Sequence, residues 1–230
     1  MFATRLRPIS MLNGLSSHRL VSTLSNNPYI KIFPNASINN THLLTYLDTN
    51  PPSQRLAIGS SSANPPTTQS FSENREFLSI LNDVLAKHAA QDPQLQSQAQ
   101  AFAGPGGTTL GSGGAFFPQQ RRKGRSAGLG GGGGAGGGGG GGASAQGGAG
   151  GGGMGGHVHL SDMRNPPDYG RIAWPEDILG SIEVDGTGQI VGEFQPSGTY
   201  RIITNEGILG LSDFIRTKLV ERLQKEEKQS

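Results

Sequence analysis

A run of glycine is the feature that most constrains what this chain can fold into. Between Gly128 and Gly156, 21 of 29 residues are glycine. Glycine loses more conformational entropy on ordering than any other residue, and it has no side chain to bury. Residues 104–156 are therefore predicted to form a long disordered Gly-rich linker. A phosphate-binding loop is not indicated, because no Lys-Ser or Lys-Thr pair follows the glycines.

The linker separates a leading part of the chain from a closing part, and the chain as a whole is poor in apolar residues. Only 33% of the 230 residues are hydrophobic, so a single large core is not expected. Cysteine is absent, which excludes disulfides and thiolate metal sites. No apolar run reaches the length of about 18–20 residues that a membrane span needs, so no span is predicted.

The first acidic residue of the chain is Asp48, and every charged residue before it is basic. The opening residues are rich in Arg, Ser, Thr and Leu, which is typical of a mitochondrial transit peptide. A secretory signal is disfavoured, because a continuous apolar region of about 7–15 residues is missing. Residues 1–25 are therefore predicted to be a transit peptide, and the protein is predicted to be mitochondrial, in the matrix. The alternative is a basic tail without targeting information.

Residues 26–103 are predicted to be partly ordered, with a helical hairpin over residues 72–103. Residues 29–33 alternate as a strand does, whereas residues 42–46 fit either a helical turn or a second strand. Ser72 is the candidate N-cap of the first helix, and Asp92-Pro93 starts the second. Apolar side chains at helical spacing predict one buried face, made by Phe77, Leu81, Val84, Leu95, Ala99 and Phe102. So small a hairpin cannot bury that face alone, so it should pack on the closing part of the chain or on another protein.

Residues 157–227 are predicted to be a small α+β module. Strands are expected at 157–160, 181–185, 189–195 and 199–204, with a helical turn at 175–180 and a tight turn at 185–188. Ser212 should cap a helix that runs to Glu227, and Trp174 should anchor the small core. The predicted fold class is α+β: a small antiparallel sheet of three to four strands with one C-terminal helix, preceded by the hairpin and the linker. A module of this size is near the lower limit of independent stability, so it should share burial with the hairpin or a partner.

Two short motifs in the closing part are candidate binding sites. His157 and His159 are the candidate metal ligands, because alternate residues of a strand point to the same face. A metal needs further ligands that the sequence does not place, so no metal and no cofactor are predicted. Pro166, Pro167 and Tyr169 match the PPxY pattern that WW domains bind, although a rigid turn is the preferred interpretation.

A basic cluster precedes the glycine run, at Arg121, Arg122, Lys123 and Arg125. Flexible basic segments can bind RNA, so these four are the candidate RNA-binding residues, although a solvated charge run is the simpler interpretation. After Gly156 the chain has eight basic and twelve acidic residues. This acidic balance disfavours nucleic-acid binding by the closing module.

No catalytic constellation is recognisable in the sequence. The acids Asp162, Asp168, Glu176 and Asp177 are interpreted as a solvated loop face. We therefore expect a non-enzymatic mitochondrial accessory or assembly protein that docks on a larger protein complex. The alternatives are an RNA- or ribosome-associated protein that uses the basic linker, a WW-binding adaptor if the chain is not imported, and an enzyme or metal protein that uses the two histidines.

Overall fold

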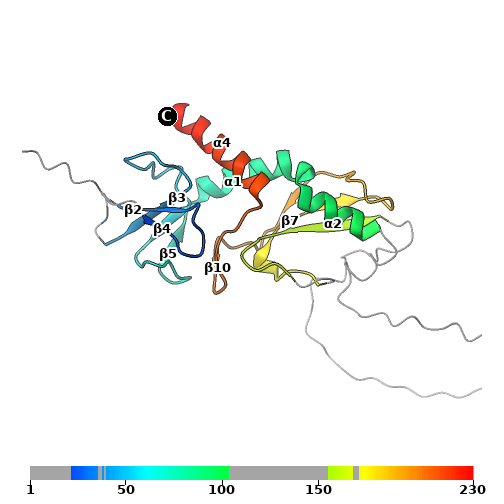
Figure 1. Ribbon diagram of the computed structural model, residues 1–230, viewed down its shortest axis with the longest axis horizontal. Helices are drawn as coiled ribbons and strands as arrows, with labels where there is room; N and C mark the ends of the chain where they lie inside the picture. Colours follow the sequence, from blue (N-terminus) through cyan, green and yellow to red (C-terminus); the bar gives the residue numbers. More distant parts are fainter. Residues whose placement is uncertain (1–21, 36–37, 39, 104–154, 168–170, 230) are drawn as a thin grey trace, which may run out of the picture.

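The computed structural model describes residues 22–35, 38, 40–103, 155–167 and 171–229, and this part of the chain has an α+β fold. Its described elements include three α-helices and three antiparallel sheets (Figure 1). The prediction is confirmed in its α+β class, its antiparallel sheets and its C-terminal helix. Residues 1–21 of the predicted transit peptide and nearly all of the predicted linker lie outside the described residues.

The largest sheet lies in residues 22–73, where the sequence predicted one strand and left a second open. Its neighbouring strands pair antiparallel in chain order: β1 (Ser22–Thr23), β2 (Lys31–Pro34), β3 (His42–Thr45), β4 (Gly59–Ser61) and β5 (Phe71–Glu73). Residues 42–46, which fitted either a helical turn or a strand, thus contribute a strand. The sequence missed β4 and β5 because they read Gly-Ser-Ser and Phe-Ser-Glu, without the alternation of a half-buried strand. At Gly59 a side chain would collide with β5, since a Cβ would lie 2.5 Å from Phe71 Cζ.

Helix α1 (Arg75–His88) begins after Asn74, so the prediction of Ser72 as its N-cap was wrong. Asn74 Oδ1 accepts a hydrogen bond from the backbone N–H of Glu76 at 3.0 Å. Asn74 Nδ2 donates to the carbonyls of Arg55 and Ala57, both at 2.8 Å. The asparagine amide therefore caps the helix and donates to two loop carbonyls at once, whereas a serine hydroxyl has only one hydrogen to donate.

Helices α2 (Pro93–Ala103) and α4 (Asp213–Gln229) begin where the sequence predicted, and the 3₁₀ turn η1 (Ala89–Gln91) joins α1 to α2. Asp92 Oδ1 accepts hydrogen bonds from the backbone N–H groups of Gln94 and Leu95, at 2.8 and 3.2 Å. Ser212 Oγ accepts one from the N–H of Ile215 at 3.2 Å. The Ser212 hydroxyl also donates to Asp92 Oδ2, so one buried carboxylate joins the N-termini of both helices.

The closing part of the chain forms two small sheets. Strands β6 (Gly156–Ser161), β7 (Ile178–Val184) and β8 (Gln195–Pro196) pair in that order, and β9 (Ile203–Thr204) pairs with β10 (Gly207–Ile208). The predicted strand 189–195 is reduced to β8 and an isolated bridge between Val184 and Ile190, and the predicted strand 199–204 to β9. The tight turn is present as predicted, because Asp185 N–H donates to Gln189 O at 2.8 Å.

One cluster of buried apolar side chains unites the two parts of the chain. It includes Phe77 and Leu85 of α1, Phe102 of α2, Ile182 of β7 and Leu219 of α4. In Figure 1, α4 crosses α1, and these two helices pack against each other, as do α2 and β6. The predicted apolar face of residues 72–103 is therefore buried against the closing part of the same chain. Among the described residues, no helix is both long and apolar enough to span a bilayer.

The two ends of the glycine-rich stretch meet in the fold. Helix α2 ends at Ala103, β6 begins at Gly156, and these two elements pack against each other. The ring of Phe102 lies so close to Gly156 that a Cβ there would be 2.6 Å from Phe102 Cζ. The chain thus leaves the fold after Ala103 and re-enters it at Gly156, next to the point where it left. The entropic cost of bringing the two ends of a loop together grows only slowly with loop length.

Candidate functional site

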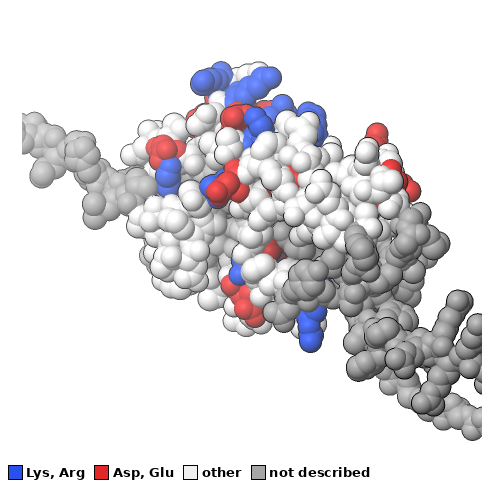
Figure 2. Space-filling model, turned by 45° about the vertical axis from the view of Figure 1, so that its right-hand side comes forward, with Lys and Arg blue, Asp and Glu red and all other residues white. Residues whose placement is uncertain are grey.

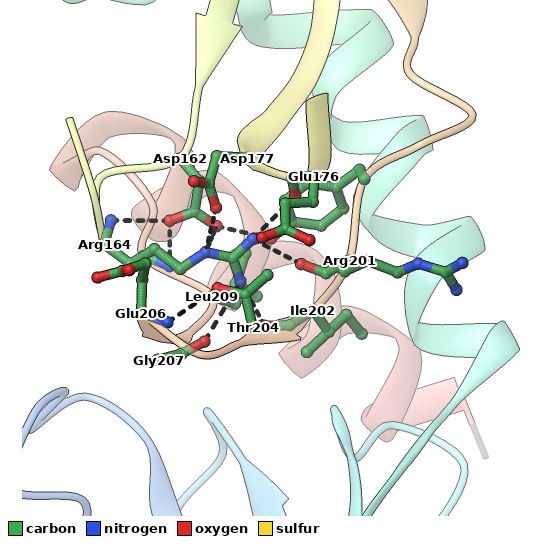
Figure 3. A network of polar contacts seen from close by, with 12 residues as sticks. Asp162, Arg164, Glu176, Asp177, Arg201, Ile202, Thr204, Glu206, Gly207 and Leu209 are labelled. Atoms are coloured by element: carbon green, nitrogen blue, oxygen red, sulfur yellow. Dashed lines mark hydrogen bonds and ion pairs between the residues drawn. The ribbon is translucent and has the colours of Figure 1, made fainter. Parts of the chain in front are cut away.

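Arg164, in the loop after β6, is the centre of a buried polar network (Figure 3). Its side chain is 3% exposed, and its Nε atom donates to Asp177 Oδ1 at 2.7 Å. Four backbone carbonyls accept the remaining N–H groups: Glu176 and Arg201 from Nη2 at 2.9 and 2.8 Å, and Ile202 and Gly207 from Nη1 at 2.9 and 3.5 Å. All five guanidinium donors have acceptors, which is the condition for burying this group without an unsatisfied donor.

Asp162, directly after β6, is the second member of this network. Its Oδ1 atom accepts from the backbone N–H groups of Arg164 and Gly210, at 2.9 and 2.8 Å, and its Oδ2 atom from the hydroxyl of Tyr200 at 2.8 Å. Burial raises the pKa of the Asp162 carboxyl above its usual value, and the Arg164 guanidinium opposes this shift. The network therefore ties the end of β6 to η2 (Pro175–Asp177) and to residues 200–210.

The interpretation of Asp162 and Asp177 as part of a solvated loop face was wrong. Both side chains are buried, at 0% and 1% exposure, whereas Glu176 is exposed and Asp168 lies outside the described residues. The sequence reasoning also missed Arg164 altogether. Asp162 and Arg164 do stand two residues apart after an apolar strand, but that spacing does not distinguish a buried pair from a solvated one.

Trp174 stands on the segment that the network holds, and it is 70% exposed. The prediction that it anchors the core was wrong, because its neighbour Ala173 turns inward instead and is 8% exposed. Every carbonyl from residue 174 to 177 accepts a hydrogen bond: Trp174 O from Asp177 N, Pro175 O from Thr199 Oγ1, Glu176 O from Arg164 Nη2 and Asp177 O from Asp162 N. A large aromatic side chain is thus presented to solvent by a fixed backbone.

The candidate metal ligands His157 and His159 lie on one face of β6, away from the buried Val158 and Leu160. His159 Nδ1 and Ser181 Oγ lie 2.8 Å apart across the β6–β7 pair. Such a cross-strand hydrogen bond stabilises a sheet. Neither histidine lines either of the two grooves described below.

Metal-ligand geometry is missing at these histidines. In the described part of the chain, no three His, Cys, Asp or Glu side chains come together as a metal site. This holds although Glu183 is the cross-strand neighbour of His157. That the protein binds no metal stays a prediction from the sequence.

The pH dependence of stability should report the burial of His159. Burial lowers the pKa of His159 below its usual value of 6.5, and His157 adds a smaller effect. The unfolded chain then takes up a proton near pH 6.5 that the folded imidazole resists, so stability should fall as pH drops through this value. Urea unfolding from pH 8 to pH 5 measures it, and His159→Gln should show a smaller fall in midpoint than the wild type.

The matched control for this prediction is His157→Gln. It removes the smaller cause of the shift and leaves His159 buried, so most of the fall should remain. Equal falls in the wild type and His159→Gln would contradict the assignment of this titration to His159.

The prolines of the PPxY motif lie against α2. Pro166 and Pro167 line a groove of about 440 Å³ together with Pro93 and Gln94 at the start of that helix and Met163 of the loop. Tyr169 lies outside the described residues, as do Arg121, Arg122, Lys123 and Arg125. The structure therefore places two of the motif's residues in a groove wall and leaves the RNA-binding candidates undescribed.

Comparison of the chain with protein-family models, curated proteins and solved structures gave no match. A function must therefore be argued from the geometry of the described residues.

Proposed function

We propose that this protein is a non-enzymatic accessory or assembly factor that docks on a larger protein complex through Trp174. The exposed indole on a fixed backbone is the observation that carries this proposal. Tryptophan is among the residues that most often dominate binding energy at interfaces, where it fills a desolvated pocket of the partner. Because the segment is already ordered, docking would lose little conformational entropy.

Trp174 differs from Val191, another exposed apolar residue, in the size of its side chain, since the backbone N–H of Val191 is also hydrogen-bonded, to Glu183 O at 3.0 Å. Val191 is 61% exposed, on the segment after the 185–188 turn. Trp174 is held by Arg164 and Asp162 of a different loop through Glu176 O and Asp177 O. In this proposal the buried network around Arg164 stabilises the fold and also holds the backbone that presents Trp174 to a partner.

Trp174→Ala should reduce the recovery of specific partner chains at least tenfold when the tagged full-length protein is purified from isolated mitochondria. The expected loss is that of an interface residue worth about 2 kcal/mol or more. The exposed side chain contributes little to folding, so the free energy of unfolding measured with urea should stay within about 0.5 kcal/mol of the wild type. Val191→Ala is the matched control and should keep the partners. Equal recovery by Trp174→Ala and the wild type would contradict docking through Trp174.

Fluorescence gives a second readout, because Trp174 is the only tryptophan in the chain. The free protein should emit like a solvated indole and be quenched readily by iodide. Binding of a partner identified by purification should shift the emission to shorter wavelength and protect it from quenching. Protection in the free protein would contradict the exposed placement of the indole.

We further propose that the chain acts in the mitochondrial matrix and that residues 104–156 are a disordered tether. The support is the acid-free, Arg- and Ser-rich start of the chain and the glycine content of the stretch. Residues 1–30 fused to a fluorescent protein test import, and a cytosolic signal would remove that part of the proposal. The RNA-binding alternative rests on residues outside the description, and the WW-binding alternative needs Tyr169, which also lies outside it, so both stay predictions from the sequence.

A further inference from the structure

A groove of about 240 Å³ lies where α1 and α4 pack against each other. Four cationic side chains line it, Lys87 of α1 and Lys218, Arg222 and Lys225 of α4, against two acidic ones, Asp83 and Glu221. Four positive charges against two negative ones leave a net charge of +2 with His88 neutral. Figure 2 shows Lys and Arg side chains gathered at the top of the molecule, where Figure 1 places these helices. The surrounding module is acidic overall, so this concentration of positive charge is local.

The cations of α4 share one face of the helix. Lys218, Arg222 and Lys225 follow one another at spacings of four and three residues, which places them in a row along the helix. Lys87 and His88 close the groove from the last turn of α1. Positive groups therefore approach the groove from both helices.

Several nitrogen groups of these residues lack a partner in the described part of the chain. The Nδ1 atom of His88 and the Nε atom of Arg222 are buried there without a hydrogen bond. Lys87 and Lys225 form no ion pair with any described residue. A polar atom buried without a partner is unfavourable, so the residues that line the groove do not satisfy all of their own hydrogen-bonding groups.

The acids near the groove do not satisfy these groups. Lys218 Nζ pairs with Glu221 at 3.0 Å, and Arg222 Nη2 pairs with Glu226 at 2.7 Å. These contacts leave Arg222 Nε, Lys87 and Lys225 unmatched. Lys87 and His88 also stand at the negative end of the α1 dipole, which is an ordinary place for cations. That role does not explain Arg222 and Lys225, which stand on a different helix.

We propose that this groove binds the phosphate group of an anionic ligand, a function separate from docking through Trp174. Charged nitrogen donors on two sides match the several acceptor oxygens of a phosphate or diphosphate. At about 240 Å³ the groove is smaller than the roughly 300–1,000 Å³ of drug-sized sites, which favours a small anion or a headgroup over a large ligand. Because the groove is open to solvent, binding weakens as salt concentration rises.

Inorganic diphosphate is the probe for the first test, titrated into the full-length protein by calorimetry at low salt. We expect saturable binding, and the double variant Lys87→Gln/Lys225→Gln should bind at least tenfold more weakly. Both lysines are exposed, so the variant should fold as the wild type does. The matched control is a double variant that removes two positive charges outside the groove. Lys228→Gln combined with Arg75→Gln removes two positive charges from the same two helices and should change the affinity less than about twofold, since neither residue lines the groove.

A second arm distinguishes a free phosphate compound from a lipid headgroup. The protein is sedimented with phosphatidylcholine vesicles, with and without phosphatidic acid. Binding to acidic vesicles that the groove variant loses and the control variant keeps would support the proposal with a lipid as the source. Saturable binding of diphosphate alone would support a free anion. The proposal would be overturned if neither diphosphate nor acidic vesicles bound to the protein. Equal losses of binding in the groove variant and the control variant would also overturn it.

Discussion

Replacing Arg164 with methionine is expected to destabilise the protein by about 3–5 kcal/mol, the usual result of removing one partner of a buried ion pair. The variant would leave Asp177 and Asp162 buried without their cation. It would also remove a donor from four carbonyls, of which Glu176 O and Ile202 O each keep a backbone N–H donor. Since native domains are stable by only about 5–15 kcal/mol, much of the total would be lost. Urea unfolding at pH 7.5, followed by circular dichroism, measures the loss.

Two variants distinguish the contribution of the planar five-donor guanidinium of Arg164 from that of its positive charge. Arg164→Lys keeps the cation but cannot reach five acceptors, so it should remain clearly destabilised. Arg201→Gln removes an exposed charge from the same region, where only the backbone of Arg201 takes part in the network, and should change stability by less than about 0.5 kcal/mol.

The pH dependence of the Arg164→Met variant gives a further check. Without the guanidinium, the largest opposing effect is lost, and burial raises the pKa of the Asp162 carboxyl against only the weaker effect of its hydrogen bonds. A carboxyl with a raised folded pKa loses stability as pH rises through that pKa, so the defect should shrink from pH 7.5 to pH 5. A variant as stable as the wild type, or a defect that grows as pH falls, would show that Arg164 is not the centre of this network.

Asp92→Ala is expected to cost about 2–4 kcal/mol, because one carboxylate supports two helix N-termini. The change removes the cap of α2 at Gln94 and Leu95, and it leaves the Ser212 hydroxyl, which caps α4, without its acceptor. Loss of a single cap costs about 0.5–2 kcal/mol, and the rest comes from the buried hydroxyl. Urea midpoints of the full-length protein measure the effect.

A double-mutant cycle tests the link between the two helices. Asp92→Ala and Ser212→Ala should be coupled by more than about 0.5 kcal/mol, since the two side chains form one hydrogen-bonded unit. Asp92→Asn keeps an acceptor for the α2 cap and should recover part of the loss. Asp83→Ala, at an exposed acid of α1, is the matched control and should be nearly neutral. Additive single effects would contradict the shared cap.

The starts of α2 and α4 and the turn at residues 185–188 could be predicted because their causes are local, whereas the start of α1 depends on Asn74 contacts with a preceding loop. Asp92-Pro93 and Ser212 place a capping oxygen next to the N–H groups of the residues that follow them. The turn at Asp185 likewise depends on a short stretch that hydrogen-bonds to itself. No such local rule identifies β4 and β5, whose strand pairing depends on neighbours that come from other parts of the chain.

The candidate sites were harder to predict than the helices for the same reason. His157 and His159 were correctly expected to share a strand face, because alternation is a property of any strand. The exposure of Trp174 was not expected, since a lone tryptophan in an apolar-poor chain favours burial. Its position depends on Arg164, Thr199 and Asp162, which reach its segment only in the folded state.

By itself the sequence determined the α+β class, the two successive helices α1 and α2, the C-terminal helix and the low burial that the glycine-rich stretch can offer. These features follow from hydrophobic periodicity, capping residues and composition, all of which act over a few neighbouring positions. Only the tertiary structure decided that the two ends of that stretch meet, that Asp162 and Asp177 are buried around Arg164, and that cations of α1 and α4 face one groove. Each of these features depends on contacts between segments that are separate in the chain. The free energy of such contacts depends on how deeply the residues are buried, which neighbouring positions in the sequence do not predict.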